Sequence, residues 1–326
     1  MSGLSLIITI LGGVIAIILI VAYQRYRSDI RATRERIMSG SKDIETKCGP
    51  IEYAARGEGP PVLVVHGAGG GYDQGLWISR DNIGEGFRII APSRFGYLRT
   101  PLPQDASPAA QADAHACLLD ALNIIKVAVV GVSAGAPSSM QFALRYPERI
   151  SSLVLIVPGT YTPEKPVESP SPVPLPFIFS MIFKSDFPLW FAMKVYPSSV
   201  LYTIGVPPVF QARLTNEQKL VLMRSLLPFS PRIDGMVNEG KIVSSLNRYP
   251  LENITAPTLV ISAADDPWKT FDPAKYTAEN IPSAKFIGFE TGGHLLIGHE
   301  EEVRSEVAQY LKQHAISNAP LSQSST

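Results

Sequence analysis

The sequence contains few of the residues that build disulfide frameworks, metal sites and charged surfaces. Only two of its 326 residues are cysteines, Cys48 and Cys117, and no C-x-x-C pair occurs. Neither a disulfide scaffold nor a cysteine-based metal site is indicated, and a reducing compartment is favoured. Acidic and basic residues balance at 29 each, so no net charge favours a nucleic-acid partner. We expect no metal ion and no other cofactor.

Charge is absent from one long stretch near the N-terminus. Residues 4–23 carry no charged side chain, and as a helix they would span about 30 Å, the thickness of a bilayer's hydrocarbon core. Five arginines follow between residues 25 and 36, whereas no lysine or arginine precedes the stretch. The positive-inside rule therefore predicts a single-pass membrane protein whose remaining chain is cytoplasmic. The alternative, a cleaved signal peptide, would have a positive n-region and a shorter apolar stretch.

Short apolar runs alternate with helical patterns over most of the remaining chain. Such runs are typical of strands buried on both faces of a parallel sheet. They occupy residues 61–65, 86–92, 127–131, 152–158, 257–262 and 284–289. Helices are predicted between them, for example over residues 107–122 and 138–146. The alternation predicts an α/β fold with a mostly parallel, doubly wound sheet.

One interval of about 90 residues, 161–248, breaks this alternation and is too long for a structureless loop. It begins with many prolines and continues with aromatic and aliphatic residues, so we predict an inserted helical lid. Phe177, Phe183 and Trp190 are candidates for covering an apolar substrate cleft or, if they face outward, for touching the membrane, unless they form the lid's own core. The predicted order is an anchor (4–23), a juxtamembrane stalk (24–45), a first core segment (46–160), the lid (161–248), a second core segment (249–315) and a disordered tail (316–326).

The apolar run 127–131 ends in Gly131-Val132-Ser133-Ala134-Gly135, and a helical pattern follows at once. This is a G-x-S-x-G pattern in a strand–turn–helix setting. Such a turn holds its serine in a strained backbone conformation with the hydroxyl above the end of the sheet. Ser133 is therefore the predicted nucleophile. A chance glycine-rich turn is the alternative for the pentapeptide taken alone.

A serine hydroxyl needs a base to take its proton, and the base needs an acid to orient it. His294 follows the sixth run after two glycines that let a loop reach back over the sheet edge, so it is the predicted base. His299, at the start of the last helical pattern, competes with it. The acid should follow the fifth run, where Asp265 and Asp266 are adjacent.

The order Ser133, Asp266, His294 resembles that of the α/β-hydrolase fold enzymes, over residues of about 46–315. The resemblance implies Asp266 as the triad acid, with Asp265 as the alternative. It also implies an oxyanion hole formed by two backbone N–H groups. One belongs to Ala134, and the other to Ala68 in the loop after the first run, with Gly69 as the alternative.

A serine at this turn implies acyl transfer through an acyl-enzyme intermediate, since related enzymes that dehalogenate or open epoxides use a carboxylate there. With the anchor and the aromatic lid, this favours a membrane-anchored serine hydrolase acting on apolar carboxylic or lipid esters. Two alternatives stay open. The same triad could cleave another bond, as in an aminopeptidase-like or carbon–carbon hydrolase. The chain could also be a non-catalytic, membrane-anchored binding protein on this fold.

Overall fold

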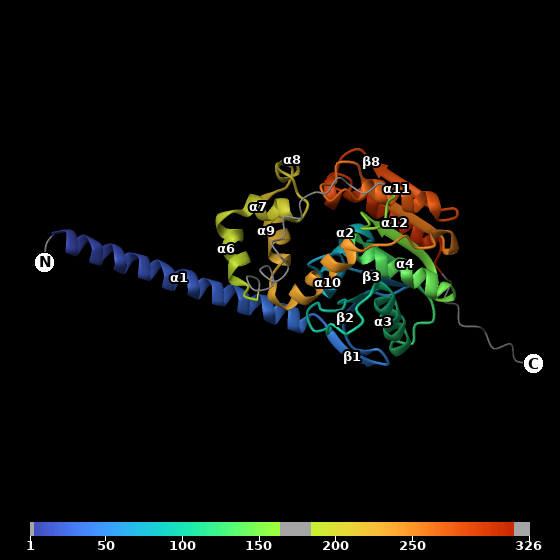
Figure 1. Ribbon diagram of the computed structural model, residues 1–326, viewed down its shortest axis with the longest axis horizontal. Coiled ribbons are helices and arrows are strands. Elements are labelled where there is room, and N and C mark those ends of the chain that lie inside the picture. Colours follow the sequence, from blue (N-terminus) through green and yellow to red (C-terminus); the bar gives the residue numbers. More distant parts are fainter. Residues whose placement is uncertain (1–2, 164–183, 316–326) are drawn as a thin grey trace, which may run out of the picture.

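In the computed structural model, residues 3–163 and 184–315 are described, and the strands in them form one eight-stranded sheet in the order β1-β2-β4-β3-β5-β6-β7-β8 (Figure 1). Six strands pair in parallel and lie within two residues of the predicted runs, which confirms the predicted α/β fold. They are β3 (Pro61–Val65), β4 (Arg88–Pro92), β5 (Val127–Val132), β6 (Ile150–Ile156), β7 (Thr258–Ala263) and β8 (Lys285–Phe289).

Two antiparallel strands that the sequence did not predict extend the sheet at one edge. β1 (Lys42–Thr46) pairs with β2 (Gly49–Arg56), and β2 pairs with β4. β1 has only exposed and half-buried residues and β2 mixes exposed with buried ones, unlike the wholly apolar runs of the central strands. An edge hairpin with solvent on one side does not produce such a run.

Helices cover both faces of the sheet, which explains why the central strands are apolar throughout. Successive residues of β3 point to opposite faces, and Leu63 and Val64 are both fully buried, in two different core clusters. On one face lie α2 (Tyr72–Asn82) and α12 (Glu300–Gln313). On the other face lie α3 (Pro108–Ala121), α4 (Ala136–Arg145) and α11 (Phe271–Asn280).

Between β6 and β7 the chain leaves the sheet and forms a group of helices beside its carboxyl edge (Figure 1). We call residues 184–248 the cap. Its apolar core includes Val200, Leu201 and Phe210 and is shared with Ile297 of the segment that follows β8. Its helices are α6 (Phe187–Val195), α7 (Pro197–Thr203), α8 (Pro208–Gln211), α9 (Asn216–Ser225) and α10 (Ile233–Ser244). Phe177 and Phe183 lie outside the described residues, as does the predicted tail 316–326.

A single helix, α1 (Gly3–Ser39), forms the N-terminal region and projects away from the sheet (Figure 1). Its length is about 55 Å, and it is long and apolar enough to cross a membrane. The apolar side chains from Ile7 to Ile20 are exposed. The segment predicted as a stalk is the second half of this helix together with most of β1, so helix and domain are joined without a flexible spacer.

The second half of α1 packs against both the cap and the sheet. Ile30 is buried with Trp190 and Leu227 of the cap, whereas Ile37 is buried against Tyr72 of α2. Arg34 donates to Asp186 over 3.0 Å. The cap is therefore held to α1 by apolar and by ionic contacts.

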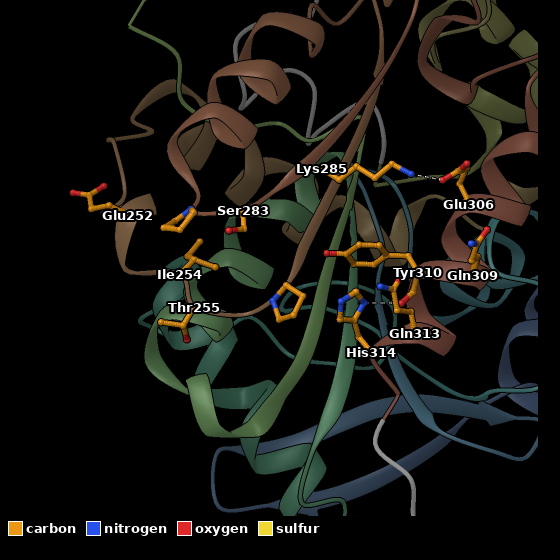
Figure 2. A pocket seen from close by; sticks show the side chains of 12 residues that line it. Glu252, Ile254, Thr255, Ser283, Lys285, Glu306, Gln309, Tyr310, Gln313 and His314 are labelled. Carbon is orange, nitrogen blue, oxygen red and sulfur yellow. Dashed lines mark hydrogen bonds and ion pairs between the residues drawn. The ribbon is translucent and has the colours of Figure 1, made fainter.

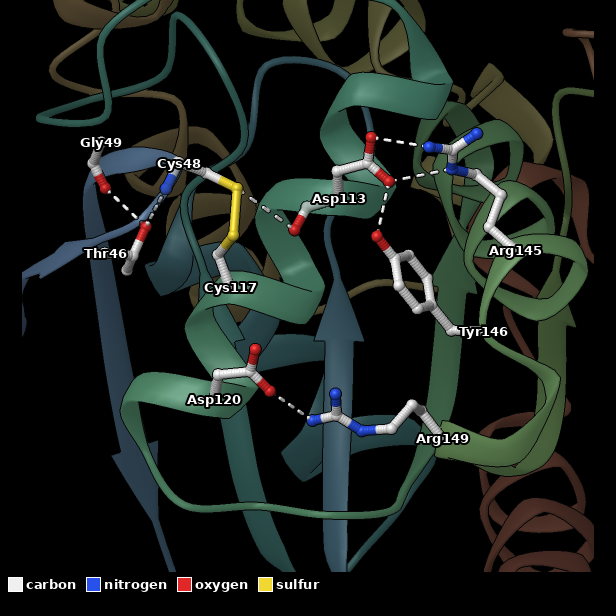
Figure 3. The surroundings of a disulfide bond; sticks show 9 residues. All are labelled: Thr46, Cys48, Gly49, Asp113, Cys117, Asp120, Arg145, Tyr146 and Arg149. Carbon is white, nitrogen blue, oxygen red and sulfur yellow. Dashed lines mark hydrogen bonds and ion pairs between the residues drawn. A yellow bond between two sulfur atoms is a disulfide. The ribbon is translucent and has the colours of Figure 1, made fainter.

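The two cysteines form a disulfide, which corrects the prediction of none (Figure 3). Cys48 lies in the turn between β1 and β2, and Cys117 lies on α3, with a distance of 6.0 Å between their Cα atoms. The prediction missed the disulfide because it missed the β1–β2 hairpin, which brings Cys48 onto α3. Next to it, Asp113 accepts hydrogen bonds from Arg145 and Tyr146 (Figure 3).

A surface cavity of about 740 Å³ opens at the amino ends of β7 and β8 (Figure 2). Its lining is mixed, and Lys285 forms an ion pair with Glu306 at its rim, with 2.6 Å between Nζ and Oε2. This cavity lies at the opposite edge of the sheet from Ser133, which follows the carboxyl end of β5.

Candidate active site

Ser133 directly follows β5 and has a φ of 52°, a conformation that non-glycine residues rarely adopt. Two neighbouring glycines make this sharp turn possible. A Cβ on Gly135 would lie 2.5 Å from the backbone oxygen of Val65, and one on Gly131 would collide with Ser139. The turn therefore raises the Ser133 hydroxyl above the end of the sheet, as the G-x-S-x-G pattern predicts.

His294 and Asp266 complete a hydrogen-bonded chain that starts at Ser133. Nε2 of His294 lies 3.0 Å from Oγ of Ser133, and its Nδ1 lies 2.8 Å from Oδ2 of Asp266. An ionised carboxylate only accepts hydrogen bonds, so Nδ1 carries the proton and Nε2 is free to accept the serine proton. The loop after β8 reaches this position through Gly292 and Gly293, which have φ values of 139° and 61°.

The surroundings of Asp266 favour its charged form. Burial by itself would raise the pKa of this carboxyl group, but hydrogen bonding to His294 and the charge of that ring hold it below its ordinary value. The Thr270 hydroxyl and the Trp268 backbone N–H also donate to Asp266 and act in the same direction. The site thus contains a buried carboxylate that stays ionised and orients the imidazole.

The alternative residues have other positions in the structure. Asp265 is exposed, and its Oδ1 accepts the backbone N–H of Gly293 over 2.8 Å, so it holds the loop that carries His294. His299 stacks on Phe289, with 4.1 Å between ring centroids, and precedes α12. Of the four predicted candidates for acid and base, Asp266 and His294 are the two that align with Ser133.

The two predicted oxyanion segments lie side by side. A Cβ on Gly67 would be 3.1 Å from Cβ of Ser133, so the loop after β3 approaches the serine turn directly. Within the described residues, neither the N–H of Ala68 nor that of Ala134 donates to a protein acceptor. The Gly67 N–H is bound instead by Oε1 of Gln74, 2.8 Å away. Two free N–H groups beside a serine are what a developing oxyanion requires.

His66 holds the loop after β3 as a neutral ring. Its Nε2 accepts the backbone N–H of Arg94 over 3.0 Å, so Nδ1 carries the proton and donates to the Gly67 carbonyl over 2.7 Å. Burial, and next the charge of Arg94, lower the pKa of His66 well below its usual value. His66 therefore stabilises the loop without exchanging protons.

The cap reaches His294 but not through Trp190, the tryptophan predicted to cover the cleft. Gly205, between α7 and α8, lies so close that a Cβ there would be 2.6 Å from Cβ of His294. The indole N–H of Trp190 instead donates to Asp29 of α1 over 2.9 Å, and its ring packs on Tyr26. Trp190 thus joins the cap to α1.

Sequence reasoning missed a buried polar network between the cap and the serine turn. Arg94, Tyr97 and Glu239 are buried, and Glu239 of α10 accepts from the other two. Burial raises the pKa of the Tyr97 hydroxyl well above its usual value, and the charge of Glu239 adds to this. A glutamate in a helical pattern is read as solvent-exposed, and its partner lies 145 residues away.

Within the described residues, no group of three or more His, Cys, Asp or Glu side chains is placed to hold a metal ion. Ser133 contacts a base, which is itself bound by an acid, and within the described residues two N–H groups without a protein acceptor lie beside it. Together they can take a proton from a hydroxyl and stabilise a negative oxygen.

Comparison with known proteins identifies the fold family. The sequence pattern of the family described as alpha/beta hydrolase fold matches residues 60–300. A 2-hydroxy-6-oxo-6-phenylhexa-2,4-dienoate hydrolase of Burkholderia cepacia is 34% identical over 250 residues, which are 73% of this chain and 82% of the relative.

Solved structures share the fold. An alpha/beta hydrolase fold protein from Nakamurella multipartita has a TM-score of 0.67 and 27% identity, covering 83% of this chain and 99% of the other. A membrane phospholipase A, described as a bacterial virulence factor, has a TM-score of 0.63 and 21% identity. That match covers 96% of this chain and 99% of the other, so it extends into the N-terminal region.

Proposed function

Since the chain belongs to the alpha/beta hydrolase fold family, we propose that it is a serine hydrolase with Ser133 as nucleophile, His294 as base and Asp266 as acid. One observation carries the proposal, the unbroken hydrogen-bond chain from Oγ of Ser133 through the imidazole to a buried carboxylate. The strained backbone of Ser133 supports it, because such strain is found where function requires it.

In the proposed reaction, His294 takes the hydroxyl proton while Oγ of Ser133 attacks the substrate carbonyl. The backbone N–H groups of Ala68 and Ala134 bind the resulting oxyanion, and the Asp266 carboxylate stabilises the imidazolium. His294 then gives the proton to the leaving group, which departs and leaves an acyl-enzyme. Water activated by the same imidazole hydrolyses this ester and frees Ser133.

We further propose that α1 anchors the protein in a bilayer and that the substrate is an apolar carboxylic ester of the lipid type. Tyr26 of α1 packs edge-on against Phe187 of α6, with 5.2 Å between ring centroids. Phe187 and Phe191 nevertheless remain 39% and 49% exposed, so an aromatic face of the cap lies beside the end of the apolar stretch. Such a face suits the membrane interface. The match to a membrane phospholipase A along nearly the whole chain supports the same proposal.

For the catalytic domain we propose the cytoplasmic side, because arginines follow the apolar stretch and none precede it. The disulfide between Cys48 and Cys117 is the observation against this side, since cytosolic thiols are kept reduced. The state of these two cysteines in cells therefore tests the topology.

A carbon–carbon hydrolase is the second candidate function. The support is the 34% identity to a 2-hydroxy-6-oxo-6-phenylhexa-2,4-dienoate hydrolase over most of both chains. Both candidates need a carbonyl substrate and an oxyanion hole, so the choice depends on the bond that the substrate presents to Ser133.

Fluorophosphonate labelling of the purified full chain tests the nucleophile. We expect label on the wild type and none on Ser133→Ala, with His299→Ala labelled like the wild type as a matched control for His294→Ala. Absence of label from the wild type would favour the non-catalytic binding protein. Hydrolysis of p-nitrophenyl esters of increasing chain length and of phosphatidylcholine vesicles, compared with 2-hydroxy-6-oxo-6-phenylhexa-2,4-dienoate, separates the two catalytic candidates.

A further inference from the structure

We propose that Glu239, on cap helix α10, positions the oxyanion hole through Arg94, so that the hole is formed only while α10 is seated on the core. The inference rests on the proposed function, since it assumes that Ser133 attacks a carbonyl. Arg94 and Glu239 are positioning residues in this proposal, because they touch the segments that supply the N–H groups rather than the substrate.

One guanidinium group holds both oxyanion segments. Nη2 of Arg94 donates to the Gly67 carbonyl over 3.0 Å, and its Nη1 donates to the Ala134 carbonyl over 3.3 Å. The Gly67 carbonyl and the Ala68 N–H belong to one planar trans peptide unit, so they point in opposite directions. Binding of the carbonyl by Arg94 and His66 therefore turns the Ala68 N–H away from them, which fixes the direction in which it can donate.

The second N–H group is fixed in the same way by a different donor. The Ser133 carbonyl shares a peptide unit with the Ala134 N–H and accepts the Gly159 N–H over 3.0 Å. This contact lies within the core. The Ala68 donor is therefore the one that depends on Arg94, and through it on the cap.

Arg94 in turn depends on Glu239. Both side chains are buried, and the Glu239 carboxylate pairs with the Arg94 guanidinium through one oxygen and with the Tyr97 hydroxyl through the other. Nε of Arg94 is buried and has no acceptor within the described residues. The ion pair with Glu239 is therefore the main compensation for the cost of burying the guanidinium charge. A buried charge that loses its partner is strongly unfavourable, and the guanidinium would move toward water.

Backbone contacts set the position of α10 closely. The Gly235 N–H donates to the Gly96 carbonyl over 2.9 Å, and a Cβ on Gly235 would collide with the ring of Tyr97. Arg232, at the start of α10, is fully buried and donates to the Gly70 carbonyl and to Asp73. The same end of the cap thus holds the oxyanion loop at a second point.

The test compares two glycines of α10. Gly235→Ala keeps every charge but must push α10 off Tyr97, whereas Gly240→Ala adds a Cβ with nothing within 4 Å. With a short p-nitrophenyl ester we expect kcat to fall about 10- to 100-fold in Gly235→Ala and in Glu239→Ala, and KM to change less than about threefold. Gly240→Ala should keep the wild-type kcat.

A transition-state analogue separates positioning from a general loss of structure. A trifluoromethyl ketone adds to Ser133 and places an oxyanion in the hole, so its inhibition constant should rise in parallel with the loss of kcat. The double variant Arg94→Met/Glu239→Leu removes the buried pair together and should keep a higher thermal midpoint than Glu239→Ala, which leaves the buried charge of Arg94 without its partner. Its kcat should stay low, because the Gly67 carbonyl has lost the Arg94 donor and keeps only those of His66 and Gly70.

Wild-type kcat in Glu239→Ala and Gly235→Ala, or in the double variant, would overturn the inference. So would loss of kcat without weaker binding of the ketone. The proposed function fails separately, if the wild type itself is not labelled by the fluorophosphonate.

Discussion

The sheet and the cap contain similar apolar residues but use them differently. In β3 and β5, residues such as Val64 and Val129 are fully buried, so folding removes their apolar surface from water. In α6 of the cap, Phe187 and Phe191 keep a large exposed surface although they follow one another on the same helix face. Apolar surface that folding leaves exposed is available for a ligand or a membrane.

The sheet and the cap also differ in the task that each performs. The loops at the carboxyl edge of the sheet bring Ser133, Asp266 and His294 together, so the core determines which chemistry is possible. The cap covers His294 at Gly205 and contacts α1 at Tyr26, so in the proposed function it selects the molecules that reach Ser133. Changes in the core should therefore act on every substrate, whereas changes on the cap's outer face should act on lipid substrates alone.

The largest effect should come from Ser133→Ala. We expect kcat to fall by roughly 10⁵-fold for a soluble short ester and for lipid vesicles alike, because the nucleophile serves both. The thermal midpoint should stay near that of the wild type. A loss confined to one of the two substrates would break the comparison.

The next largest loss of activity should come from substitution of one of the two neighbouring aspartates. Asp266→Asn should lower kcat by about 10³- to 10⁴-fold, since an amide cannot hold the imidazole in the required tautomer. Asp265→Asn keeps an oxygen for the Gly293 N–H and should lose less than about tenfold. Equal losses in the two variants, measured with p-nitrophenyl acetate, would contradict the assigned acid.

The disulfide should contribute to stability, and the state of its two cysteines in cells should report the side of the membrane. A link between positions 69 residues apart contributes about 4 kcal/mol to the free energy of unfolding, so Cys48→Ser/Cys117→Ser should unfold at lower urea concentration. Protein taken from cells, denatured without reductant and then treated with maleimide, should be modified at both cysteines if the domain is cytoplasmic. If the domain is exported, neither cysteine should be modified until a reductant is added.

Acid should destabilise the core through its buried histidines. Burial lowers the pKa of His115 to about 3, and that of His66 also falls well below its ordinary value. The unfolded chain then binds more protons, so stability is full above about pH 6.5 and falls by up to about 1.4 kcal/mol per pH unit and histidine below it. Urea unfolding of His115→Gln between pH 4 and 7 should show a smaller loss.

The smallest effect should appear on the outer face of the cap. Phe191→Ser, at a position 49% exposed, should lower the rate on phosphatidylcholine vesicles about fivefold and leave the rate on a short soluble ester unchanged. Leu220→Ser on α9, with 38% exposure, offers a control in which serine also replaces an exposed apolar side chain. An equal loss in both variants would show that the aromatic face has no special role.

Features encoded by consecutive residues could be predicted from the sequence, whereas contacts between distant segments could not. The buried parallel strands and the serine turn each occupy consecutive residues, so local patterns predicted them. The hairpin that carries Cys48 has no such pattern, and the disulfide was missed with it. The pairing of Arg94 with Glu239 joins distant segments through one contact, which no local periodicity encodes. The position of Trp190 depended on α1 continuing into the domain, whereas the arginine-rich segment suggested a separate stalk.

Because α1 is one continuous helix, its length fixes the direction in which the rest of the protein faces about the helix axis. Each residue of an α-helix turns the chain by about 100° and advances it by about 1.5 Å. One residue inserted between Tyr23 and Tyr26 would rotate the whole catalytic domain by that angle about the helix axis, and would swing the aromatic face of the cap away from the side it now occupies. Seven inserted residues, close to two full turns, would restore the direction while raising the domain by about 10 Å. Changing the length of one helix thus changes the direction in which the cap faces in steps of about 100° and its distance from the apolar stretch in steps of about 1.5 Å.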